Sequence, residues 1–116
     1  MNISAFARSN AAVSLALVLA FAHFAHAEDQ AAYLAENDAA MAKMMRDMEV
    51  KPSGDVDRDF VAMMVPHHQG AIDMAQALLR YGRNEQLRRL AQEIIVAQQQ
   101  EIVVMRRAVG EPQAAK

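Results

Sequence analysis

The sequence contains no cysteine, so no disulfide can stabilise it and no thiolate can bind a metal. A chain of 116 residues without disulfides must be held together by packing, by a ligand or by association. Its formal net charge of −2 provides no strong attraction to nucleic acid or to an anionic membrane. We therefore expect one small domain with no nucleic-acid partner.

Long hydrophobic runs are also missing, except for one near the N-terminus. Arg8 precedes an apolar run over residues 11–22, and about twelve residues are fewer than the roughly twenty needed to cross a bilayer. A small-x-small site ends at Ala27, and an acidic pair follows it. This layout is typical of a secretory signal peptide. We predict a signal peptide over residues 1–27, cleavage after Ala27, a periplasmic or otherwise exported location, and no stable membrane insertion afterwards.

Serine is scarce in the rest of the chain, where Ser53 is the only one. His67 and His68 are adjacent and could transfer protons, but no nucleophile lies at a recognisable spacing from them. We therefore do not expect an enzyme.

Strand-like alternation is absent, and strong helix formers dominate after the predicted signal peptide. The expected fold is all-α, a small antiparallel bundle of three helices over residues 28–110, followed by a frayed tail over 111–116. The expected helices run from about residue 30 to 49, from Asp55 or Asp57 to about Gly82, and from Asn84 to about Val109.

Two features should shape the second and third helices. The link over residues 82–84 is short, so these helices should be antiparallel neighbours, with Gly82 as the glycine that follows a helix end. Pro66 lies inside the second helix and removes one backbone hydrogen bond. We expect a kink or a break there.

Methionine and histidine are concentrated in these helices, because eight of the nine methionines follow the predicted signal peptide. Leucine would specify a core better than so many methionines. On a helical wheel, Met63, His67 and Met74 share one narrow line of the apolar side, with Met64 and His68 beside them. Thioether and imidazole without thiolate favour copper, above all Cu(I), with Ag(I) as its mimic.

His67, Met63 and Met74 are the first candidate ligands, followed by His68, Met64 and either Met44 or Met45. Met41 and Met48 complete a methionine stripe on the first helix. Gln98 and Glu101 lie in the apolar arc of the third helix and could accept a hydrogen bond from a ligating histidine. The alternatives stay open: the methionines and histidines could be core residues, and Gln98 and Glu101 could be partly exposed at a bundle end.

Sites for other metals fit less well. Di-iron bundles need Glu-x-x-His pairs, and zinc proteases need His-Glu-x-x-His; the sequence contains neither. The segment 55–59 alternates aspartates as a calcium loop does, but it lacks the glycine and the later glutamate.

A longer pattern runs through the last two expected helices. It consists of Phe60, Met63, Met64, Pro66, His67, His68, Gln69, Gly70, Ala71, Asp73, Met74 and Ala75, then Leu90, Ala91, Ile94, Ile95, Gln98, Glu101, Ile102 and Met105. This pattern resembles the signature of the DUF305 family, and the resemblance covers about Met41 to Met105.

The resemblance implies a ferritin-like helical fold and export, and some members are described as periplasmic copper-binding proteins linked to copper tolerance. It marks Met105 as a further candidate ligand, and it matches Met41, Met44, Met45 and Met48 more loosely. The chain lacks the longer Met/His-rich extensions of some members, so a lower metal capacity is expected.

We therefore expect an exported copper-binding protein that prefers Cu(I) and serves copper buffering, transfer or tolerance, with exported copper-handling proteins as partners. The alternative is a helical interaction module without metal, which forms a homo-oligomer or binds a partner through its Met-rich faces.

Overall fold

The computed structural model describes residues 3–111, with side chains described for Val18, Leu19 and 21–111. It contains three helices, α1 (Ile3–Asp47), α2 (Val56–Tyr81) and α3 (Glu85–Ala108), and no strand among the described residues. The all-α prediction is confirmed. Of the predicted frayed tail, residues 112–116 lie outside the described residues.

The first helix is longer than expected, because α1 begins at Ile3 and not near residue 30. The apolar run of the predicted signal peptide is rich in alanine and leucine, which also favour helix. The chain divides within α1 into two units, residues 1–32 and 33–116. Signal-peptide cleavage stays a prediction. Over the described part of the chain, no helix combines the length and apolar character needed to span a membrane.

The predicted starts of α2 and α3 are confirmed by their N-caps. The Asp55 carboxylate accepts hydrogen bonds from the backbone N–H groups of Asp57 (3.0 Å) and Arg58 (3.2 Å). The Asn84 side-chain oxygen accepts two bonds of 3.0 Å in the same way, at the start of α3. Both side chains satisfy backbone donors that a helix start leaves without partners.

The end of α2 differs in detail from the expectation. Gly82 follows the helix with φ −75° and ψ 145°, which is extended and not left-handed. The Arg88 guanidinium, from α3, donates to the carbonyl oxygens of Leu79 (2.6 Å) and Gly82 (2.9 Å). Because Arg88 satisfies these carbonyls, the helix end needs no left-handed turn.

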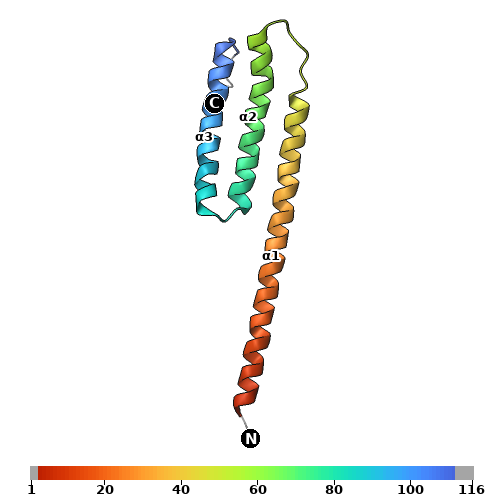
Figure 1. Cartoon of the computed structure of the whole chain (residues 1–116), viewed down its shortest axis with the longest axis vertical. Coiled ribbons are helices and arrows are strands. Elements are labelled where there is room, and N and C mark those ends of the chain that lie inside the picture. Colours follow the sequence, from red (N-terminus) through yellow and green to blue (C-terminus); the bar gives the residue numbers. More distant parts are fainter. Residues whose placement is uncertain (1–2, 112–116) are drawn as a thin grey trace. The chain divides into compact units, whose positions relative to one another are not determined.

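Pro66 does not break α2, which continues from Val56 to Tyr81. The expectation of a break is therefore wrong, and the kink stays a prediction. Helices α2 and α3 pack side by side and run antiparallel, as the short link predicts (Figure 1).

The core of the second unit is built mainly from small side chains. Ile72 is the largest fully buried residue. The other buried residues are Ala40, Val61, His68, Gly70, Ala75, Ala77, Ala91 and Ile102. Small residues let helix backbones approach closely but bury little apolar area each. Larger apolar side chains are left along the edges of a thin core, where they line grooves.

Candidate metal-binding cavity

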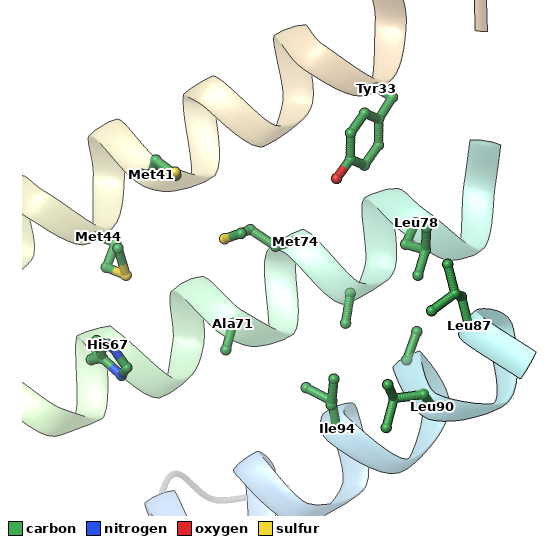
Figure 2. Close-up of a pocket in the computed structure, with 12 residues that line it drawn as sticks. Tyr33, Met41, Met44, His67, Ala71, Met74, Leu78, Leu87, Leu90 and Ile94 are labelled. Carbon is green, nitrogen blue, oxygen red and sulfur yellow. The ribbon is translucent and has the colours of Figure 1, made fainter. Parts of the chain in front are cut away.

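A cavity of about 480 Å³ opens along α2 between the end of α1 and the start of α3. Met41, Met44, Met74 and His67 line it together, so the structure brings four of the predicted ligands to one place. The remaining lining is aliphatic except for Tyr33. Figure 2 shows that Met74 extends from α2 toward the part of α1 that carries Met41 and Met44.

The opposite end of the cavity carries none of the candidate metal ligands. Leu78 from α2 and Leu87, Leu90 and Ile94 from α3 form this aliphatic end (Figure 2). Tyr33 of α1 also lines the cavity, and its hydroxyl is the one oxygen-bearing side-chain group of the lining. The thioethers and the imidazole thus border a largely apolar space.

Gly70 positions Met44 against α2. A Cβ atom at Gly70 would lie 2.6 Å from Met44 Sδ and 2.9 Å from both Met44 Cβ and Met44 Cγ. Any larger residue would therefore displace Met44 or the α1 backbone. The glycine lies in the helix interior, where it is unfavourable, so close approach is the physical reason for its presence.

The four candidate ligands of the cavity lie at different levels along the axis of α2. His67 and Met74 are two helical turns apart, about 10 Å along the axis, and Met44 reaches α2 between them at Gly70. Methionine has three rotatable bonds, so its sulfur can move toward a shared ion without a change in the backbone. The imidazole of His67 makes no hydrogen bond among the described residues that would hold its nitrogens away from the cavity.

His68 is placed differently, although it is adjacent to His67. Its side chain is buried, with Nδ1 at 2.8 Å from the Met64 carbonyl oxygen and Nε2 at 2.7 Å from Glu101 Oε2. Both ring nitrogens therefore already face oxygen acceptors. A metal could reach either nitrogen only after one of these bonds broke, so His68 links α2 to α3.

Glu101 makes the contact expected from the antiparallel arrangement, as an acceptor for an imidazole on α2. Its partner is His68 and not the cavity residue His67. Gln98 is half-buried and lies on the same side of α3. A supporting role for Gln98 and Glu101 toward a bound metal stays a prediction.

The other candidate ligands lie outside the cavity. Met63 shares the angular position of His67 and Met74, but it is about 16 Å from Met74 along α2 and is 43% exposed. Met45 is exposed on α1. The half-buried members of this group are Met48, Met64 and Met105.

The cavity lining contains no carboxylate, and the described residues hold no group of three or more histidine, aspartate or glutamate side chains that could bind a metal. Its donors are therefore neutral and soft. The cost of moving an ion into a medium of low dielectric rises with the square of its charge, so a doubly charged ion costs about four times as much as a singly charged one. These donors fit a soft monovalent cation.

A polar cluster holds α1 and α2 together beside the aliphatic end. The Glu36 carboxylate accepts hydrogen bonds from Tyr81 Oη (2.7 Å) and Arg80 Nε (2.8 Å), and from Arg80 Nη2. The Tyr81 hydroxyl first and the Arg80 guanidinium second hold the pKa of Glu36 below its ordinary value of 4.5. The same contact raises the pKa of Arg80. This cluster fixes the α1 wall of the cavity.

The sequence analysis missed Tyr33 and the aliphatic end of the cavity. Tyr33 and Met41 are separated by two steps of four residues along α1, which place them near one face of a helix. Helical spacing could therefore have identified Tyr33. The neighbours of Leu78 and Leu87 depend on how α2 and α3 pack.

Comparison of the sequence with known proteins assigns the chain to a family. No curated protein matches the chain. The family model DUF305, described as a domain of unknown function, matches residues 8–109, which is most of the sequence. The chain therefore belongs to the DUF305 family.

Proposed function

We propose that this protein is an exported copper-binding protein that takes up Cu(I) at the cavity through Met41, Met44, Met74 and His67. It would serve copper buffering, transfer or tolerance. The observation that carries the proposal is that three thioethers and one imidazole from two helices line one largely apolar cavity. Export is inferred from the layout of the first 27 residues.

The chemistry of the donors supports Cu(I) over Cu(II). Thioether and imidazole are neutral and soft or borderline, which suits Cu(I) and its mimic Ag(I). Cu(II) prefers nitrogen and oxygen donors in a tetragonal arrangement, and the cavity offers one imidazole and one phenol. The site also uses no thiolate, which would be at risk of oxidation in an exported protein, and the oxidation of a methionine thioether to the sulfoxide is enzymatically reversible.

The uneven exposure of the four side chains supports exchange of the ion. Met41 is 42% exposed and His67 is also exposed, whereas Met44 and Met74 are half-buried. The exposed pair would meet an incoming ion or a partner's ligand first. The half-buried pair would hold the ion against the apolar wall. A site open on one side suits buffering and transfer better than permanent storage.

The proposal is tested by competition for Cu(I) against a chromophoric chelator under anaerobic conditions. We predict that the purified protein removes Cu(I) from the chelator and that His67→Ala combined with Met74→Leu abolishes this. Met74→Leu nearly conserves side-chain volume, so it removes the sulfur with little change in packing. Met45→Leu is the matched control, because Met45 is exposed and outside the cavity. An unchanged affinity in the double variant would refute the assignment.

A second candidate function is an interaction module without metal. It is supported by the exposure of Met41, Met45 and Met63, which leaves flexible apolar side chains on the surface. Light scattering in the presence of a chelator distinguishes the two. A stable metal-free assembly that the exposed Met45→Glu and Met63→Glu substitutions dissociate would favour the module.

A further inference from the structure

The three thioethers of the cavity differ in how far solvent reaches them. Met41 is 42% exposed, whereas Met44 and Met74 are half-buried. The chain has no cysteine, so methionine sulfur is the only sulfur that an oxidant can attack. Because the oxidation of protein sulfur follows its exposure, the cavity presents one accessible thioether and two shielded ones.

Packing between α1 and α2 explains the shielding. The Met44 side chain lies against Gly70, where a Cβ atom would be 2.6 Å from the Met44 sulfur. Figure 2 shows that Met44 points from α1 toward α2 and that Met74 extends from α2 toward α1. Each of these two side chains is thus directed at the opposite helix. Met41 lines the same cavity but keeps a large part of its side chain in contact with solvent.

We propose that Met41 is an oxidation-sensitive ligand, and that its conversion to the sulfoxide by a peroxide closes the cavity to Cu(I). The inference rests on the proposed function, because it concerns the regulation of that same site. The Met41 sulfur attacks one oxygen of hydrogen peroxide, the O–O bond breaks, and the second oxygen leaves as water with the proton of the first. The sulfur is oxidised by two electrons and the peroxide is reduced by two.

The sulfoxide is a poor ligand for a soft monovalent ion. It is polar and presents a hard oxygen donor, whereas Cu(I) prefers soft donors. A polar group is also unfavourable against the largely apolar lining of the cavity. Two thioethers and one imidazole would remain. The affinity for Cu(I) should fall by at least about tenfold, since even the loss of a group that only supports a ligand costs about that much.

Two other methionines provide an internal comparison. Met45 is 57% exposed and Met63 is 43% exposed, and neither lines the cavity. Peroxide should therefore oxidise them about as readily as Met41, but without consequence for Cu(I). Reduction of the sulfoxides by methionine sulfoxide reductase should reopen the site, because this oxidation step is reversible. Exposure and position at the cavity together thus single out Met41.

Graded peroxide treatment of the purified metal-free chain tests the order of oxidation. Peptide mass spectrometry locates each added oxygen, and the peroxide is removed before anaerobic competition for Cu(I) against a chelator. Met41 should be oxidised before Met44 and Met74, and the affinity should fall as the Met41 sulfoxide accumulates, with the helix content unchanged by circular dichroism. Oxidation of Met44 or Met74 ahead of Met41, or a loss of helix content that accounts for the lost affinity, would overturn the proposal.

Substitutions separate Met41 from the other exposed methionines. Met41→Leu should bind Cu(I) more weakly from the start, and mild peroxide treatment should weaken it no further. Met45→Leu is the matched control, because Met45 is exposed outside the cavity; this variant should lose affinity on oxidation as the wild type does. A wild type that binds Cu(I) equally before and after Met41 is oxidised would overturn this inference alone. A chain that binds no Cu(I) before oxidation would refute the proposed function, and this inference with it.

Discussion

Gly70 is a residue at which a side chain of α1 packs directly against α2. Its missing Cβ makes room for the Met44 side chain, so a backbone feature of α2 determines where a sulfur of α1 lies. His68 has a comparable effect on the other side of α2, where its imidazole joins the helix to Glu101. The adjacent residue His67 is left exposed with its side chain at the cavity. Two adjacent histidines of one helix thus differ in role, since His68 packs between helices and His67 lines the cavity.

At Gly70 we predict that alanine destabilises the fold by about 1–3 kcal/mol, because the added Cβ forces Met44 and the α1 backbone to move. The higher helix propensity of alanine offsets part of this, by up to about 1 kcal/mol. Urea unfolding of Gly70→Ala, Met44→Ala and the double variant measures the effect. The double variant should be more stable than the sum of the two single effects implies. Simple additivity would show that the two residues do not interact.

At the scale of the elements, side chains from both neighbouring helices hold the C-terminal end of α2. Arg88 satisfies carbonyl oxygens at its C-terminal end, and Glu36 of α1 binds both Arg80 and Tyr81. These contacts connect all three helices near the aliphatic end of the cavity. No comparable polar contact between α1 and α2 is seen at the methionine end among the described residues, where Met44 packs on Gly70.

The Glu36 cluster makes stability depend on pH. The pKa of Glu36 is lowered in the folded protein, so its contribution is present above the ordinary value of 4.5 and is lost as the pH falls through the lower folded value. The side chain is about one-third exposed, so the effect is screened by solvent. We predict that Glu36→Gln lowers the free energy of unfolding at neutral pH and that the difference from wild type disappears as the pH falls through the lowered folded pKa of Glu36.

Chemical denaturation of the wild type and Glu36→Gln across pH 3 to 7 checks this dependence. The comparison is needed because Asp59, whose pKa is also lowered, mainly by its hydrogen bonds with Ser53, titrates in both proteins. A difference between the two proteins that stays constant with pH would mean that the Glu36 charge does not hold the helices together.

At the scale of the whole molecule, local sequence features predicted most of the helix bounds. Which candidate ligands lie together in the cavity depends on how the helices pack. Asp55 and Asn84 can be recognised as N-cap residues from the local sequence, so the starts of α2 and α3 were predicted correctly. The helical wheel compares angles alone, so it aligned Met63 with Met74, although their separation of eleven residues corresponds to about 16 Å along the helix. Helical spacing from Met41 could have identified Tyr33, whereas the place of Leu78 and Leu87 at the cavity depends on how α2 and α3 pack. The ferritin-like relationship implied by the family resemblance stays a prediction.

The central claim is that this cavity binds Cu(I) through methionine sulfur and one histidine. X-ray absorption spectroscopy of the Cu(I)-loaded protein tests it most directly, because sulfur and nitrogen neighbours scatter distinguishably. We predict a first shell dominated by sulfur with one nitrogen, and the loss of one sulfur in Met74→Leu. A shell of nitrogen and oxygen alone, or an identical shell in Met74→Leu, would contradict the claim.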